Sequence, residues 1–148
     1  CAISFCPTSN LFLGSGLFDA DAAQAAGLPV GIGTDVGGGT SFSVIRTLHE
    51  AHKVLQLRGQ HLDAMRGFYL ATLGGARALG LDGEVGNFET GKYADFVLLD
   101  KSSTPLIARR MQQAASLDEL LFAAMMLGEE HMVAATFAQG RCVYRQCE

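Results

Sequence analysis

The first half of the chain alternates short apolar runs with segments of helical periodicity. The runs at residues 2–5 (AISF) and 28–34 (LPVGIGT) are almost continuously apolar, as is usual for strands of a parallel sheet covered by helices on both faces. A helix is expected from an Asp19 cap to Gly27, and a longer one over residues 42–58, since glycine follows each helix at the position that ends many helices. This alternation predicts an α/β fold.

Shorter segments connect these elements. The stretch CPTSN (6–10) is expected to form a loop, because its small polar side chains can satisfy nearby backbone groups. Two short helices are predicted over residues 62–71 and 72–79, the second capped by Thr72. The second carries two adjacent glycines, which weaken an isolated helix, so close packing is expected to favour them there.

The pattern changes after residue 82. Strands are predicted over residues 94–99, 132–137 and 141–145, and the last two are expected to form a hairpin around a Gln-Gly turn. One helix is predicted between the first and second of these strands, from a Ser116 cap with Glu119 three residues later.

Composition narrows the classes of partner. Of the 148 residues 49% are apolar and 18% charged, and the net charge is −4 with no basic cluster, which argues against binding to nucleic acid. The longest clear apolar run, at residues 120–127, is far shorter than the ~20 residues of a membrane-spanning helix. We expect a cytoplasmic protein without a membrane partner.

The most informative motif is GTDVGGG at residues 33–39. Asp35 follows an apolar strand, at the carboxyl end where α/β enzymes place their chemistry. Glycines beside it let the backbone approach a ligand closely. No lysine follows the glycines, as a phosphate-binding P-loop requires, and the dinucleotide pattern GxGxxG is not met. Asp35 is therefore the first candidate for a catalytic residue.

Four segments carry a resemblance to a known family. They are CPTSNLFLGSGLF (6–18), GTDVGGGTSFS (33–43), ATLGGARALGLDGEVGNFETGKYADFVLLD (71–100) and LFAAMMLGEEHMVAATFAQGRCVY (121–144). In this order they resemble the carboxyl-terminal portion of the guanine deaminase family, which belongs to the amidohydrolase superfamily. The combination of SNLFLGSG with TDVGGGTSFS is the most specific part of the match.

The resemblance implies a fold. Residues 1–81 would be the end of a TIM-type (β/α)8 barrel, with strands seven and eight and their helices. Residues 82–148 would be the carboxyl-terminal strands of a small β-sandwich, with one helix. A complete barrel needs about 250 residues, and the chain starts at Cys1 without an initiator methionine. We therefore expect an incomplete fragment of a larger protein.

The resemblance also implies an activity. The family uses Zn²⁺ to hydrolyse guanine to xanthine and ammonia, and the aspartate matching Asp35 binds the metal and moves protons. The family's HxH pair, two further histidine ligands and a glutamate have no counterpart here, so the chain alone is expected to be inactive. The resemblance further implies a homodimer; no substrate-binding residue is identified.

Two alternatives remain open. The chain could belong to another amidohydrolase, a deaminase or chlorohydrolase acting on a different heterocycle. It could also be a non-catalytic interaction module that retains the sequence of an enzyme.

Two other patterns are interpreted as structural. The four cysteines form two pairs with five-residue offsets, Cys1/Cys6 and Cys142/Cys147. Such an offset places the side chains on opposite faces of a strand, so buried or free thiols are expected. The HEAH stretch is one residue short of the zinc-binding HExxH motif, and His49 and His52 are expected to be surface histidines.

Overall fold

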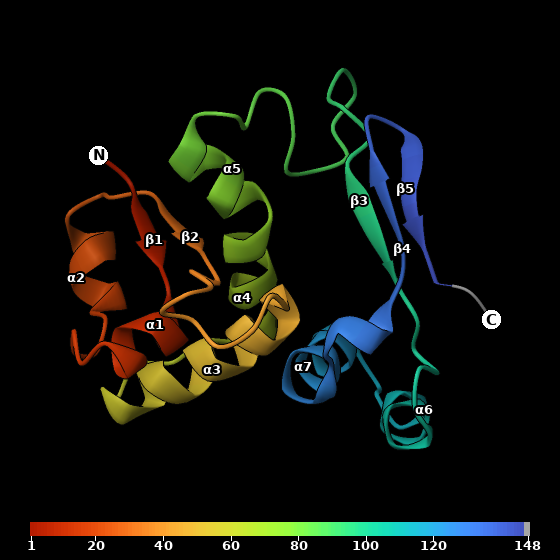
Figure 1. Ribbon diagram of the computed structural model, residues 1–148, viewed down its shortest axis with the longest axis horizontal. Helices are drawn as coiled ribbons and strands as arrows, with labels where there is room; N and C mark the ends of the chain where they lie inside the picture. Colours follow the sequence, from red (N-terminus) through yellow and green to blue (C-terminus); the bar gives the residue numbers. More distant parts are fainter. Residues whose placement is uncertain (147–148) are drawn as a thin grey trace.

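A computed structural model describes residues 1–146 of the chain (Figure 1). The first half contains, in order, β1 (Ile3–Phe5), α1 (Pro7–Phe12), α2 (Ala20–Ala25), β2 (Val30–Ile32), α3 (Val44–Leu57), α4 (Ala64–Ala71) and α5 (Leu73–Leu79). The second half contains β3 (Phe96–Leu99), α6 (Pro105–Gln112), α7 (Leu117–Leu127), a 3₁₀ turn η1 (Glu130–Met132), β4 (Val133–Ala138) and β5 (Arg141–Arg145). The predicted α/β character is confirmed.

Strands β1 and β2 form a two-stranded parallel sheet in which Ser4 lies opposite Gly31. Helix α2 lies on one side of this sheet and α4 and α5 on the other (Figure 1). Phe5 is buried in a cluster with Leu55 and Leu62. A Cβ atom on Gly31 would lie 2.9 Å from the Cα of Gly75 in α5. The absence of a side chain at Gly31 therefore lets β2 and α5 pack closely at Gly75.

Most predicted helices of the first half are confirmed, with two corrections. Asp19 caps α2, because its side chain accepts a 2.9 Å hydrogen bond from the backbone of Ala22. The expected loop at residues 6–10 is wrong: Pro7 occupies the first turn of α1, where its fixed φ favours a helix and its missing N–H is not needed. Thr72 does not cap α5, since its hydroxyl donates to the carbonyl of Phe68 at 2.7 Å.

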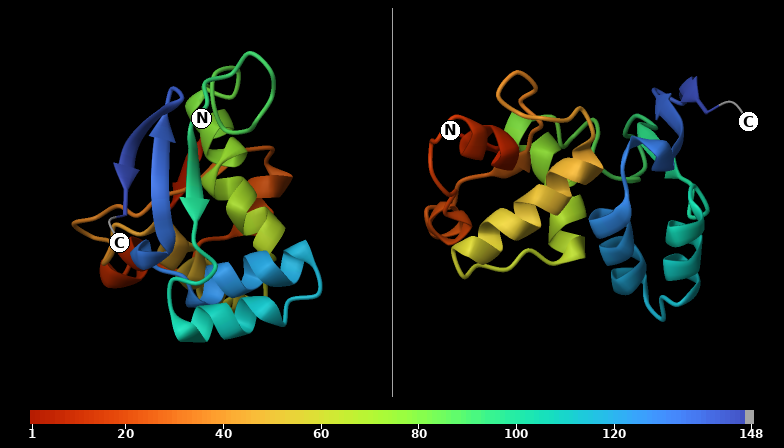
Figure 2. Two further views of the ribbon diagram at one scale, coloured as in Figure 1. Left: turned by 90° about the vertical axis from the view of Figure 1, so that its right-hand side faces the viewer. Right: turned by 60° about the horizontal axis from the view of Figure 1, so that its bottom comes forward.

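The second half builds a three-stranded antiparallel sheet in the order β3-β4-β5, which the left view of Figure 2 shows with α6 and α7 packed together beyond one end. Phe96 and Phe137 stack across β3 and β4 with ring centroids 4.5 Å apart. The expectation of one helix between β3 and β4 is wrong, because both α6 and α7 lie there. Helix α6 was missed although Thr104 caps it, accepting from Ile107 N, and Pro105 lies in its first turn.

Helix α7 links the two halves, because Met125 is fully buried with Leu48 of α3 and Ala64 of α4. Helices α3 and α7 pack side by side, as the right view of Figure 2 shows. Ser116 caps α7 as predicted, and the Glu119 carboxylate accepts from the backbone of Ala115 at 2.8 Å. The division of the chain at residues 81 and 82 stays a prediction.

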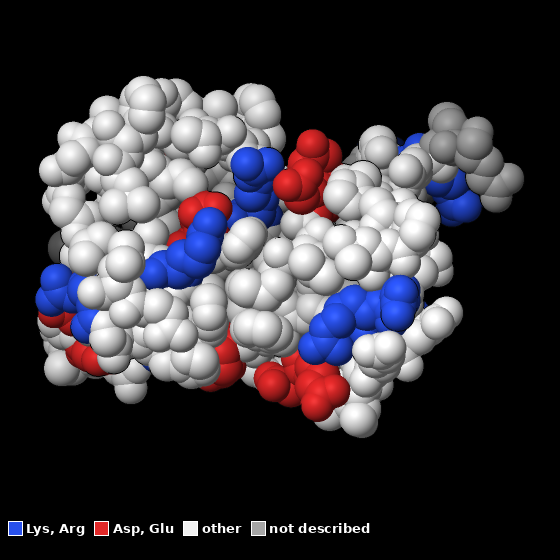
Figure 3. Space-filling view, turned by 90° about the horizontal axis from the view of Figure 1, so that it is seen from below, with Lys and Arg blue, Asp and Glu red and all other residues white. Residues whose placement is uncertain are grey.

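Charged side chains are sparse on the face drawn in Figure 3, where small groups of both signs are separated by uncharged surface. Within residues 1–146, no helix is both long enough and apolar enough to cross a lipid bilayer. Cys1, Cys6 and Cys142 are free thiols. Cys147 lies outside the described residues.

Candidate functional site

Asp35 lies three residues beyond β2, at the carboxyl end of the parallel sheet and on the exposed surface of the chain. Its backbone φ is +47°, a left-handed conformation that residues other than glycine adopt rarely. Such conformations persist where the surroundings impose them, and they gather at active sites. The backbone of Asp35 therefore agrees with its prediction as a functional residue.

Residues 33–39, called here the glycine loop, fold back on this aspartate. The carbonyl oxygen of Asp35 accepts hydrogen bonds from Gly38 N at 3.1 Å and Gly39 N at 2.5 Å. A Cβ atom on Gly39 would overlap the carbonyl oxygen of Thr34. The tight turn therefore requires glycine at position 39.

The side chain of Asp35 is held by a residue that the sequence did not identify. The Ser9 hydroxyl donates a 2.6 Å hydrogen bond to Asp35 Oδ2. Ser9 belongs to α1, directly after β1, and parallel pairing brings the carboxyl ends of β1 and β2 together. The sequence places Ser9 in a segment read as a loop whose hydroxyls bond locally. The signal that could have found it is its position after the neighbouring strand.

The donor set fits a metal only in part. A carboxylate oxygen is a normal ligand for zinc, and Asp35 Oδ1 has no hydrogen bond within residues 1–146. No group of three or more His, Cys, Asp or Glu side chains in those residues could hold a metal ion. Asp35 can supply one ligand, and the described part of the chain does not bring the remaining ligands to it.

The histidines of α3 are engaged in packing. The ring of His52 is half-buried, with Nδ1 2.8 Å from the carbonyl oxygen of Leu62 and its edge toward Phe122. Burial lowers the pKa of His49, and the charge of Lys53 acts in the same direction. The expectation of surface histidines holds only in part, because both side chains are half-buried.

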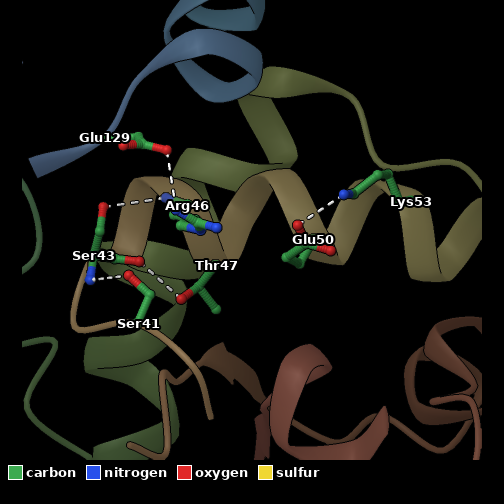
Figure 4. A network of polar contacts seen from close by, with 7 residues as sticks. All are labelled: Ser41, Ser43, Arg46, Thr47, Glu50, Lys53 and Glu129. Atoms are coloured by element: carbon green, nitrogen blue, oxygen red, sulfur yellow. Dashed lines mark hydrogen bonds and ion pairs between the residues drawn. The ribbon is translucent and has the colours of Figure 1, made fainter. Parts of the chain in front are cut away.

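A polar network holds the segment that follows the glycine loop (Figure 4). The hydroxyl of Ser41 accepts from Ser43 N at 3.0 Å, and the hydroxyl of Ser43 caps α3 by accepting from Arg46 N at 3.2 Å. Thr47 donates to the carbonyl of Ser43 at 2.9 Å. Arg46 also pairs with Glu129 at 3.1 Å, which connects α3 to the segment after α7.

A cavity lies beside residues 27–30 at the amino end of β2, and its lining also includes Phe5 at the carboxyl end of β1. This cavity of about 410 Å³ is lined mostly by apolar side chains from β1, β2 and the surrounding helices, with Arg66 and Arg77 among the polar ones. Arg66 donates to Gln24 at 3.1 Å, and Arg77 donates to the Tyr69 hydroxyl at 2.9 Å. Its lining contains no carboxylate.

Known proteins resemble the chain over almost its whole length. The sequence model of the Amidohydrolase family matches residues 1–143. Guanine deaminase of Escherichia coli K12 is 51% identical over 145 residues, which are 98% of this chain and 33% of that protein. The structure of E. coli guanine deaminase superimposes with a TM-score of 0.95, covering 99% of this chain and 34% of the other.

Two further similar structures contain bound ligands. A guanine deaminase from C. acetobutylicum with bound guanine has a TM-score of 0.79 at 26% identity, over 97% of this chain and 34% of the other. An adenosine deaminase from Xanthomonas campestris with bound zinc also has a TM-score of 0.79, at 30% identity, over 95% and 31%. The chain thus spans about a third of the length of the relatives that it matches.

Proposed function

Because this chain belongs to the amidohydrolase family, we propose that it is the carboxyl-terminal part of a zinc-dependent guanine deaminase. The observation that carries the proposal is Asp35 at the end of β2, in a strained conformation and bonded to Ser9. The 51% identity to a guanine deaminase supports guanine as the substrate. The complete enzyme would convert guanine and water to xanthine and ammonia.

The proposed architecture places residues 1–81 at the end of a (β/α)8 barrel and residues 82–148 in a small β-sandwich. Parallel pairing of β1 with β2 supports their assignment as strands seven and eight. In a barrel, catalytic residues come from the carboxyl ends of the strands, which is where Asp35 lies. The antiparallel β3-β4-β5 sheet supports the sandwich assignment.

Asp35 has two proposed tasks, which are to bind zinc and to move a proton. Zinc, when bound, lowers the pKa of a coordinated water toward 7. Asp35 would then accept the proton of the water that attacks the guanine carbon bearing the exocyclic amine. The histidine ligands and the glutamate that helps protonate the ring would lie in the rest of the complete enzyme. This chain matches only about a third of its relative's length.

The test uses the complete protein that carries this chain. Purified with zinc, it should release xanthine and ammonia from guanine, and a chelator should abolish the reaction. Adenosine and a triazine offered in parallel should react much more slowly. Faster turnover of either one would favour the alternative of a different heterocycle, and no turnover of any would favour a non-catalytic module.

The 148-residue chain alone should form no xanthine, because most ligands for metal and substrate are missing. It should bind zinc no more tightly than its Asp35→Ala variant does, since a single carboxylate cannot hold the ion against water. Chelator-sensitive xanthine formation by this chain would mean that its own residues complete the site.

Self-association is also proposed, as a homodimer in the complete, cytoplasmic enzyme. In the described residues β1 and β2 pair only with each other, and unpaired strand edges attract other strands. Large apolar side chains are also exposed, with Phe42 86% and Phe88 84% accessible. Light scattering should show association of this chain at micromolar concentration, and a monomer throughout would contradict it.

A further inference from the structure

The contact between Ser9 and Asp35 joins a buried residue to an exposed one. Ser9 is only 3% exposed, and its hydroxyl lies 2.6 Å from Asp35 Oδ2. An ionised carboxylate only accepts hydrogen bonds, so the hydroxyl is the donor. The distance is in the short range of hydrogen bonds between a hydroxyl and a charged oxygen. The bond therefore holds Oδ2 of Asp35 as the acceptor.

The position of Ser9 is fixed from both sides. Its carbonyl oxygen accepts a 2.9 Å hydrogen bond from the N–H of Leu13, the residue that follows α1. On the other side a Cβ atom on Gly38 would lie 2.5 Å from Ser9 Oγ. The missing side chain at position 38 is therefore what lets the hydroxyl enter between α1 and the glycine loop.

We propose that Ser9 is a positioning residue for Asp35, which builds on the function proposed above. The hydroxyl holds Oδ2 toward α1 and so fixes the rotation of the carboxylate. Oδ1, for which no hydrogen bond is found within residues 1–146, would then be the oxygen that can hold the metal and take a proton. Ser9 is buried and its hydroxyl donates to Asp35, so its proposed role is exerted through Asp35.

The experiment compares variants of the complete, zinc-loaded enzyme. Ser9→Ala should lower kcat by about 10- to 100-fold, which is typical when a residue supporting a metal ligand is removed. KM for guanine should change by less than about threefold, because the lost interaction does not bind substrate. Zinc release to a chelator, followed by a metal-sensitive dye, should become about tenfold faster.

Three further variants separate positioning from folding. Ser9→Thr keeps the donor and should recover most of the kcat and of the zinc retention. Thr8→Ala removes the neighbouring hydroxyl of α1, for which no hydrogen bond is found in residues 1–146, and it should behave like the wild type. Gly38→Ala keeps Ser9 but displaces its hydroxyl, and it should reproduce the Ser9→Ala defect even if Ser9→Ala folds poorly.

The outcomes distinguish this inference from the proposed function. A wild-type enzyme without guanine turnover contradicts the proposed function. An active wild type whose Ser9→Ala and Gly38→Ala variants keep normal kcat and zinc release overturns the role of Ser9. That role is also overturned if Ser9→Thr is as defective as Ser9→Ala, because the effect then follows packing and not the hydrogen bond.

Discussion

The carboxyl end of β2 leads into a carboxylate on a tight glycine loop, whereas the residues at its amino end line a cavity of about 410 Å³. The usual expectation is that a ligand occupies the largest apolar pocket with a few polar groups. Here the cavity holds arginines that bond to neighbouring side chains. The glycine loop holds Asp35 in a left-handed conformation, and the buried hydroxyl of Ser9 orients its carboxylate.

The difference teaches which observations indicate chemistry in this chain. Strain at Asp35 has an energetic cost of order 1–3 kcal/mol that the surrounding structure must offset. Nothing in the cavity lining requires a comparable cost, since its residues pack as ordinary core and surface. Gln139, in the turn between β4 and β5, has a similar φ of +50°, so the proposal for Asp35 depends on its carboxylate and its hydrogen bond to Ser9 as well as on its backbone.

The largest effect is expected from Asp35 in the complete enzyme. Asp35→Ala removes a proposed zinc ligand and the proton acceptor, and general base catalysis alone is worth about 10²–10⁴-fold. We expect kcat to fall by at least about three decades in Asp35→Ala and Asp35→Asn, with zinc content better preserved in Asn. The exposed Asp21→Asn serves as control. Near-normal turnover by Asp35→Asn would remove the proton-transfer role.

The next largest effect is expected from Gly39→Ala. The added Cβ would overlap the carbonyl oxygen of Thr34, so the glycine loop must shift and carry Asp35 with it. A displacement of about 1 Å at a catalytic group can lower the rate by about 10²-fold. Gly83→Ala is the matched control, because an added Cβ there meets no atom within 4 Å. Equal kcat values in the two variants would show that turnover does not depend on the conformation of the glycine loop.

The strands and most helices could be predicted from the sequence because local signals agree with packing. Asp19 and Ser116 each precede an apolar stripe, and each caps its helix as expected. Helix α1 was missed because Thr8, Ser9 and Asn10 are common in loops, while the helix depends on Pro7 and on tertiary packing. Helix α6 was missed although Thr104-Pro105 is a recognisable start.

The site could be predicted only in part. Asp35 could be proposed as a site residue because its strand and glycines are contiguous in the sequence. Ser9 lies 26 residues earlier, and only the pairing of β1 with β2 brings it to Asp35. The positive φ of Asp35 also depends on the turn closed by Gly39. Long-range contacts of this kind leave no periodic signal in a single sequence.

The next effect concerns the pH dependence of stability, to which His49 is expected to contribute. Burial lowers the pKa of His49, so below its ordinary value of about 6.5 the unfolded chain binds a proton more readily than the folded chain. The free energy of unfolding should therefore fall as the pH falls through that value. His49→Gln should weaken this fall in denaturant unfolding between about pH 7.5 and 5.5. If the free energy of unfolding fell equally in the wild type and in His49→Gln, His49 would not be a cause of the fall.

The smallest effect is expected at the amino-end cavity. Arg66→Ala removes the hydrogen bond to Gln24 and opens the cavity further, but the Arg66 side chain bonds to Gln24 and not to the glycine loop. The free energy of unfolding should change by about 0.5 kcal/mol or less, as for most surface substitutions, and kcat and KM should match those of a Lys101→Ala control. If the cavity were instead the guanine site, loss of a donor from its lining would raise KM while kcat and zinc content stayed normal. That result would reverse the comparison, because the hollow would then bind the substrate and Asp35 would not be the residue that takes the proton of the attacking water.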